Sequence, residues 1–218
     1  MKKIDATFGI AILLTAAIAL CSACNGKTQP QEAPQEPTAA PTAAKPTEPE
    51  AEPTEDDGSD TGETEPLQTV TMYRVPMNEG LQLYIISEAE RYGVDPAIVF
   101  AIIEQESEFN TTAIGDNGES LGLMQVQEKF HRDRMARLAV DDLLNPYQNA
   151  SVGIDFLAYL IAYYHGNVEM AVMAYNAGQT GAHNNWFRDE VFSNEYSQAV
   201  LMKAHTISAS AFEKVVTK

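Results

Sequence analysis

The residue best placed to do chemistry is Glu106, one of three acids in the segment 104–108. At about 100° per residue, a helix would place Glu106 on the same face as Ile103 and would place Glu104 on the opposite face. A carboxylate among apolar side chains loses contact with water, and its pKa rises. We therefore expect Glu106 to act as a general acid near neutral pH.

The helix that would position Glu106 has recognisable ends. Asp95 suits the N-cap position and Pro96 the first helical position, which predicts a helix over 96–107 with Glu108 beyond its end. The pattern of the later two thirds of the chain is helical almost throughout, without an alternating strand signal, so we expect an all-α fold. Loops are predicted over 107–121 and 179–186, and further helices over 79–92, 122–126, 128–138, 146–164, 167–177 and 194–215.

Residues 1–24 have the features of a lipoprotein-type signal peptide. Two lysines precede an apolar run over 8–20 that is too short to cross a membrane comfortably. Small residues before Cys24 resemble a bacterial lipobox, so we expect Cys24 to be lipidated and the protein to be anchored to the membrane outside the cytoplasm. Because Cys21 stands where leucine is usual, cleavage without a lipid and a retained membrane anchor stay open.

Residues 25–69 have the composition of a disordered linker. Proline, threonine, glutamate and alanine dominate, aromatic residues are absent, and eleven acids stand against two lysines. Such a segment cannot bury enough apolar area to offset its ordering entropy, and its prolines and self-repulsion keep it extended. We expect a spacer between the anchor and a folded domain over 70–218.

Charge and cysteine content exclude several classes of function. The net charge of −17 leaves no basic surplus for nucleic-acid phosphates or an anionic membrane surface. No cysteine follows Cys24, so the folded part has no disulfide and no cysteine-based site. Neither a metal site nor a cofactor is expected, because the histidines are scattered without ligand spacing at positions His131, His165, His183 and His205.

Four short segments carry a family resemblance. They are Glu-Ser-Glu-Phe-Asn at 106–110, Gly-Leu-Met-Gln-Val at 122–126, Asn-Pro-Tyr-Gln-Asn at 145–149 with Gly153, and Ala-Tyr-Asn-Ala-Gly at 174–178. Their order and spacing resemble the lytic transglycosylase branch of the lysozyme-like superfamily, the soluble lytic transglycosylase type. The resemblance covers about 80–205 and implies a lysozyme-like helical domain with a substrate cleft.

The resemblance also implies a mechanism. Glu106 would protonate the glycosidic oxygen between N-acetylmuramic acid and N-acetylglucosamine, and would then accept the proton of the muramic C6 hydroxyl, leaving a 1,6-anhydro end. The N-acetyl oxygen of the substrate can support the positive charge between these steps, so a second protein carboxylate is not required. The family's tyrosine, Tyr175 here, stands close to the acid and hydrogen-bonds the acid or the substrate. The residues expected to bind substrate are Ser107, Asp116, Met124, Gln125, Tyr175 and Asn176.

Structural interpretations stay open for several of these residues. Met124 suits the core as well as a sugar-binding surface, and Leu123 suits the core better. Tyr175 can simply pack. Asp116 precedes Asn-Gly, where a turn residue is typical.

The chain departs from the family pattern at three positions. Gly115 stands where serine is common, and Gln127 and Gln179 stand where proline is common. The segment 115–126 is also similar to goose-type lysozymes, inverting hydrolases that use two acids to position water. Asp116 matches the first of these acids, but Gln127 replaces the second.

Two alternative functions therefore remain beside a lytic transglycosylase. A muramidase would hydrolyse the same bond with Glu106 as acid and Asp116 holding water. A non-catalytic peptidoglycan-binding protein is the third possibility. The partners expected in all three cases are peptidoglycan glycan strands, with the membrane reached through the lipid on Cys24.

Overall fold

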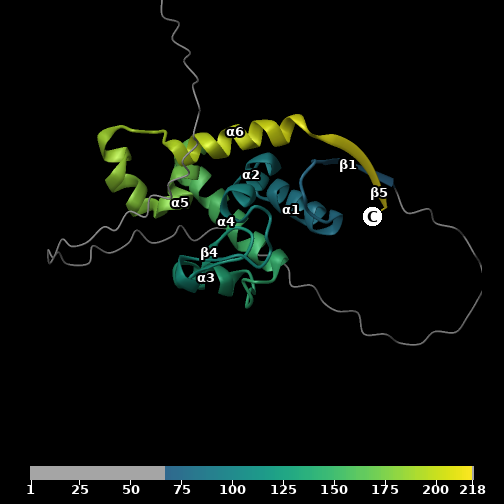
Figure 1. Ribbon diagram of the computed structural model, residues 1–218, viewed down its shortest axis with the longest axis horizontal. Helices are drawn as coiled ribbons and strands as arrows, with labels where there is room; N and C mark the ends of the chain where they lie inside the picture. Colours follow the sequence, from purple (N-terminus) through teal and green to yellow (C-terminus); the bar gives the residue numbers. More distant parts are fainter. Residues whose placement is uncertain (1–66, 218) are drawn as a thin grey trace, which may run out of the picture. The chain divides into compact units, whose positions relative to one another are not determined.

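The computed structural model describes residues 67–217 (Figure 1). The predictions for the signal peptide, for lipidation of Cys24 and for nearly all of the linker at 25–69 therefore lie outside the described residues.

Helix α2 (Pro96–Ser107) carries Glu106 in its last turn. Its beginning matches the prediction, since the Asp95 side chain accepts a hydrogen bond from the Ala97 N–H at 2.8 Å. The apolar side chains of α2 are almost all buried. The most extensive helix contact in the described region is between α2 and α6 (Glu195–Ala209), and Figure 1 shows these two helices lying together.

The other helices also begin close to where the sequence predicts. Asparagine side chains cap α1, α4, α5 and α6 by accepting hydrogen bonds from N–H groups of the first turn. The bounds are α1 (Glu79–Arg91), α3 (Glu128–Arg137), α4 (Pro146–Tyr163) and α5 (Val168–Asn185), with 3₁₀ turns η1 (Asp116–Gly118) and η2 (Phe187–Asp189).

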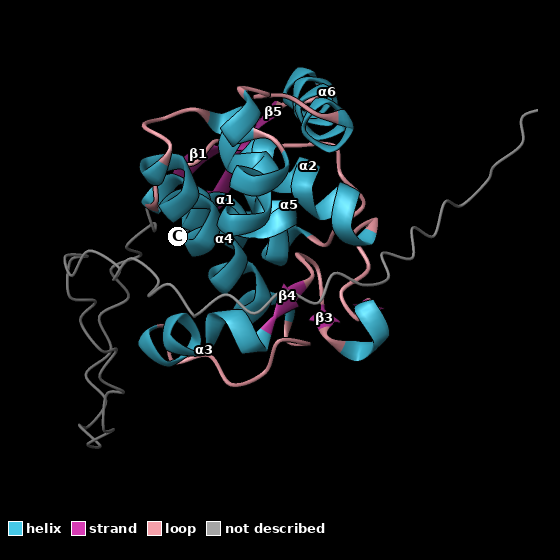
Figure 2. Ribbon diagram, turned by 90° about the vertical axis from the view of Figure 1, so that its left-hand side faces the viewer, coloured by secondary structure: helices cyan, strands magenta, loops and turns pink. Residues whose placement is uncertain are grey.

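Two small sheets accompany the helices of the described region, and the sequence pattern predicts neither. Strand β1 (Leu67–Met72) pairs antiparallel with β5 (Phe212–Thr217). The predicted helix over 194–215 is therefore wrong beyond Ala209, because the final segment pairs with a strand at the opposite end of the described chain. The second sheet has the order β2 (Ile114–Gly115), β3 (Ser120–Leu121) and β4 (Val126–Gln127), and Figure 2 shows it beside α3.

Two further predictions, one of a helix and one of a loop, are wrong for backbone reasons. The segment 122–126 is a turn followed by β4, because Gly122 and Gln125 adopt φ angles of 69° and 48°. The predicted loop over 179–186 is largely helical: Gly178 breaks α5 with φ 69° and ψ 157°, and the chain then continues as helix to Asn185. The helical class of the fold is nevertheless confirmed, with the strands confined to short segments.

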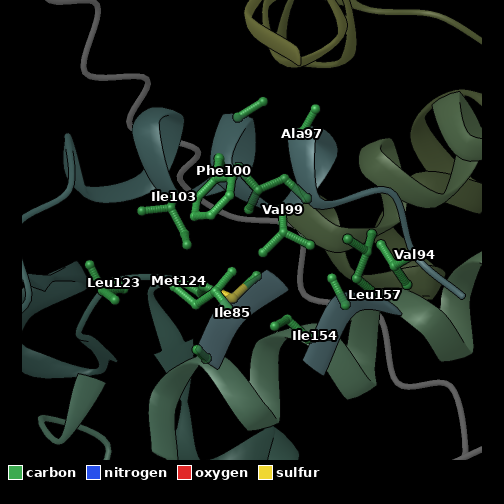
Figure 3. Packing of buried hydrophobic residues seen from close by; sticks show 14 of the residues in the cluster. Ile85, Val94, Ala97, Val99, Phe100, Ile103, Leu123, Met124, Ile154 and Leu157 are labelled. Carbon is green, nitrogen blue, oxygen red and sulfur yellow. The ribbon is translucent and has the colours of Figure 1, made fainter. Parts of the chain in front are cut away.

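The main apolar core lies between α1, α2 and α4, and Figure 3 shows part of it. A close contact joins α4 to the segment before β4: a Cβ added at Gly153 would lie 2.4 Å from the Met124 sulfur. Only glycine fits there without displacing Met124. Within 67–217, every helix is too short or too polar to span a membrane.

Candidate active site

Glu106 is partly buried at the end of α2, and its carboxylate accepts a hydrogen bond at Oε1 from the Tyr196 hydroxyl. Burial is the largest influence on Glu106 and raises its pKa. The hydrogen bond from Tyr196 acts in the opposite direction, and the negative charge of Asp116 raises the pKa further. The net effect is a raised pKa, as the apolar face of the helix predicts.

Tyr196, which hydrogen-bonds the acid, is not among the site residues that the sequence predicts. Tyr196 lies in the first turn of α6, which the Asn194 side chain caps by accepting from the Ser197 N–H at 2.8 Å. Burial and the negative charge of Glu106 raise the pKa of Tyr196, so its hydroxyl keeps its proton and donates it. No local pattern signals this contact, because its partners are 90 residues apart and meet only through the packing of α6 on α2.

Tyr175 lies near enough to Glu106 to feel its charge, but its hydroxyl does not hydrogen-bond the carboxylate. Its hydroxyl donates to the Met124 carbonyl oxygen at 2.9 Å, and its ring lies 5.4 Å from that of Phe156. Burial and then the negative charge of Glu106 raise the pKa of Tyr175 well above its ordinary value. The resemblance implies that Tyr175 hydrogen-bonds the acid or the substrate, and in this structure the hydrogen bond to the acid comes from Tyr196.

Two residues expected to bind substrate point into the protein instead. Met124 is fully buried against Gly153, and its N–H donates to Asn149 Oδ1 at 2.9 Å. Ser107 is also buried, and its hydroxyl donates to the Ile103 carbonyl oxygen at 3.0 Å. Both expectations are corrected: Met124 is a core residue, and the Ser107 hydroxyl bonds the preceding helical turn.

Gln125 is half-buried and closes the loop before β4. Its Nε2 donates to the Gly122 carbonyl oxygen at 2.9 Å and to the Ala113 carbonyl oxygen at 3.3 Å. A Cβ at Gly115 would lie 2.4 Å from Gln125 Oε1. The glycine that departs from the family's serine therefore leaves room for this amide. Oε1 is the part of the amide that can still accept a hydrogen bond from a ligand.

Asp116 is exposed and held by two donors. Its Oδ2 accepts from Ser120 Oγ at 2.5 Å and from Gln127 Nε2 at 3.0 Å. Gln127 occupies the position of the second goose-type acid, so a carboxylate–amide pair stands where two carboxylates would position water. Asn176, next to Tyr175, is exposed, and its side chain makes no hydrogen bond to another residue of 67–217.

A buried ion pair fixes α3 against α4. Arg134 Nε donates to Asp155 Oδ1 at 2.6 Å, and Arg134 also contacts His131 Nδ1 at 3.0 Å. Because Arg134 can only donate, His131 Nδ1 accepts and Nε2 carries the proton. Burial and the positive charge of Arg134 lower the pKa of His131 to about 4, so the ring is neutral at physiological pH.

The two other acids of the segment 104–108 are Glu104 on α2 and Glu108, which lies just beyond the end of this helix. Glu104 pairs with Lys203 of α6 at 2.7 Å. Glu104 and Glu108 line a groove of about 590 Å³, and Glu106 is not among its lining residues. Glu104 and Glu106 therefore face different sides of α2, as the helical periodicity predicts, and Glu108 lies beyond the helix end.

A helical domain with one desolvated glutamate at the end of a core helix has the features of a lysozyme-like domain. Comparison with known proteins defines the family. The transglycosylase SLT domain matches residues 83–198, more than half of the chain, and the chain belongs to that family. The resemblance inferred from the four sequence segments is thus confirmed.

Individual relatives agree with this assignment. Membrane-bound lytic murein transglycosylase C of Yersinia enterocolitica is 29% identical over 144 residues, which cover 60% of this chain and 38% of the relative. Endo-type membrane-bound lytic murein transglycosylase A of Citrobacter koseri is 30% identical over 157 residues, covering 66% of this chain and 75% of the relative. The chain thus matches well under half the length of the first of these relatives.

A solved structure shares the fold. The lytic transglycosylase Slt of Pseudomonas aeruginosa, crystallised as an inactive glutamate-to-glutamine mutant, aligns with a TM-score of 0.54 and 25% sequence identity. The alignment covers 62% of this chain and 25% of the other chain.

Proposed function

We propose that the protein is a peptidoglycan lytic transglycosylase that cleaves the β-1,4 bond between N-acetylmuramic acid and N-acetylglucosamine and leaves 1,6-anhydromuramic ends. The observation that carries the proposal is Glu106 itself, a desolvated carboxyl group with a raised pKa and a tyrosine hydroxyl as its partner. Membership of the SLT family and the names of the relatives support the same reaction.

The geometry fits a single residue, Glu106, that acts first as general acid and then as general base. Tyr196 binds Oε1, and no described residue hydrogen-bonds Oε2, so Oε2 is the atom that would carry the proton. Protonated Glu106 would give this proton to the glycosidic oxygen as the C1–O bond breaks. The carboxylate, stabilised by Tyr196, would then take the proton of the C6 hydroxyl as the new C1–O6 bond forms. Proton and bond changes balance without water.

A muramidase is the second candidate, and Asp116 is the observation that favours it. Its charge acts on Glu106, and one of its oxygens, Oδ1, has no partner among the described residues. Against this reading, Gln127 supplies a donor where the second water-positioning acid would accept.

Mass spectrometry of digested peptidoglycan tests the two candidates. We expect anhydromuramic ends on the products. Reducing muramic ends would contradict the transglycosylase proposal and favour the muramidase.

We also propose that the enzyme works outside the cytoplasm, anchored to the membrane by a lipid on Cys24. The domain organisation in this proposal is a signal peptide at 1–24, an acidic spacer at 25–69 and the catalytic domain at 70–218. The composition of the first 69 residues and the membrane-bound relatives support it. Mass spectrometry of the mature amino terminus should find diacylated Cys24; a lipid-free terminus would contradict the anchor.

A further inference from the structure

A series of aromatic rings leads away from the candidate active site. We call it the aromatic ladder and define it as Phe156, Tyr159, Tyr163, Tyr164, Phe187 and Phe192. Its first ring, Phe156, contacts Tyr175 beside the acid at 5.4 Å. The Arg134 guanidinium lies over both Phe156 and Tyr159, at 5.0 and 5.7 Å from the ring centroids. The next ring contacts run from Tyr159 to Tyr163, Tyr164, Phe187 and Phe192 at 5.0–6.1 Å.

Packing explains only part of the ladder. Tyr164 and Phe187 lie against a small second core beneath α4 and α5, so their burial stabilises the fold. Tyr163 and Phe192 do not share this role, because 49% and 46% of their surfaces are exposed to solvent. Burial in the second core therefore does not account for these two rings, which present aromatic surface to solvent.

The chain around the ladder is rich in neutral hydrogen-bonding groups. The only arginine in 176–198 is Arg188, and it pairs with Asp189 at 3.4 Å. An anionic lipid surface or a nucleic acid would need unpaired basic residues there. Amide side chains, which both donate and accept, occur at Asn176, Gln179, Asn184, Asn185, Asn194 and Gln198.

Aromatic faces beside amide groups are suited to a neutral polyhydroxylated chain. A pyranose ring has an apolar face that packs on an aromatic ring and a polar edge that needs hydrogen-bond partners. An aromatic residue of the ladder already pairs with an amide side chain, since the Tyr159 hydroxyl donates to Gln179 Oε1 at 3.5 Å. From Phe156 to Tyr163 the ladder follows α4 for roughly 10 Å, enough to engage more than one sugar.

Both ends of the ladder are connected to the reaction centre. Phe156 contacts Tyr175, whose pKa responds to the charge of Glu106. Phe192 lies four residues before Tyr196, the tyrosine that donates to Glu106, in the non-helical segment that leads into α6. The ladder thus begins at a ring that contacts a tyrosine near the acid and ends four residues before the tyrosine that binds the acid.

We propose that the exposed rings of the ladder, Tyr163 and Phe192, form an extended glycan-binding surface that holds the strand beyond the sugars next to the scissile bond. This inference rests on the proposed function, because it names the part of the same substrate that lies further from Glu106. The proposal predicts that the affinity of the protein for glycan increases with the length of the glycan strand.

The test is binding of glycan of two lengths in a Glu106→Gln background, so that turnover does not interfere. The probes are purified uncrosslinked glycan strands and a tetrasaccharide cut from them. Tyr163→Ala with Phe192→Ala should weaken binding of long strands about tenfold and change tetrasaccharide binding less than about twofold. Tyr163→Phe, which keeps the ring, should bind long strands as the parent does.

The matched control is Phe130→Ala, which removes an exposed ring on α3 outside the ladder and should leave both affinities unchanged. Circular dichroism and the thermal unfolding midpoint verify folding, and if the double variant is unfolded the Phe192→Ala single variant replaces it. Unchanged binding of long strands, or equal weakening for both lengths, would overturn the proposal that the ladder binds glycan. Reducing ends on wild-type products would instead overturn the proposed function and leave the length-dependent binding intact.

Discussion

The two sides of the candidate active site are built by different means. On the helical side, Glu106 of α2 and Tyr196 of α6 are positioned by apolar packing between two long helices. On the loop side, the segment 113–127 holds Asp116 and Gln125 through side-chain hydrogen bonds and left-handed backbone. Packing removes water from the acid and raises its pKa, whereas the loop keeps its polar groups near the surface. The helical side thus determines the pKa of the Glu106 carboxyl group, and the loop side supplies polar groups around it.

The largest expected effect comes from removing the acid. Glu106→Gln keeps the shape of the side chain but cannot donate a proton, and we expect wall-cleaving activity to fall by about 10²–10⁴-fold. The matched control is Glu104→Gln on the opposite face of α2, which loses the Lys203 pair and should keep activity. Zymography and product release from peptidoglycan give the measurement. Activity retained in Glu106→Gln would exclude Glu106 as the acid.

The same variant has an opposite effect on stability. The folded-state pKa of Glu106 is raised, so the wild-type protein loses stability as pH rises from the unfolded-state pKa through the folded-state pKa. Glutamine has no such dependence. Glu106→Gln should therefore be more stable than wild type at neutral pH, and the difference should disappear below the ordinary pKa of glutamate. Urea unfolding at several pH values measures it.

The junction between α4 and the loop side should be sensitive to a single methyl group. In Gly153→Ala the new Cβ would lie 2.4 Å from the Met124 sulfur, and we expect a loss of about 1–3 kcal/mol in the free energy of unfolding. Gly80→Ala is the control, because its Cβ would find its nearest atoms at 3.7 Å. Equal stability of the two variants would contradict the close packing of Met124.

Tyr196→Phe distinguishes the role of Tyr196 from that of Tyr175, the other tyrosine near the acid. The lost hydrogen bond favoured the ionised carboxylate, so the pKa of Glu106 should rise further and the alkaline limb of the pH–rate profile should move to higher pH. We expect kcat to fall about tenfold, because the carboxylate formed after proton donation loses a partner. Tyr175→Phe removes a hydroxyl that binds the Met124 carbonyl oxygen, and it should lower stability while leaving this limb in place.

The sequence predicts the helical side of the site better than the loop side, for a physical reason. Caps such as Asp95 and the apolar face of α2 are local signals, and they place Glu106 correctly on a desolvating face. The contact with Tyr196 depends on how α6 packs, which no local pattern contains. The sequence leaves Met124 open between the core and the substrate surface, because its burial is decided by Gly153 on α4, which is distant in sequence.

The loop side and the strands follow the same rule. Gln125 takes a left-handed φ of 48° that the helical periodicity does not reveal, so the sequence pattern over 122–126 wrongly predicts a helix. Strand β5 forms because β1 is available at the opposite end of the described chain. Local signals thus predict where helices begin. By contrast, pairing with β1, which is distant in sequence, makes the last segment a strand.

The smallest expected effect comes from the loop side, in Asp116→Asn. The negative charge of Asp116 raises the pKa of Glu106, so its removal should move the alkaline limb to lower pH, opposite to Tyr196→Phe. Asp116 is exposed and its charge is screened, so activity at the optimum should stay within about threefold of wild type and the products should keep anhydromuramic ends. A loss comparable to that of Glu106→Gln would instead assign Asp116 to water positioning. The opposite shifts of the two variants would show that both sides of the site act on the same carboxyl group.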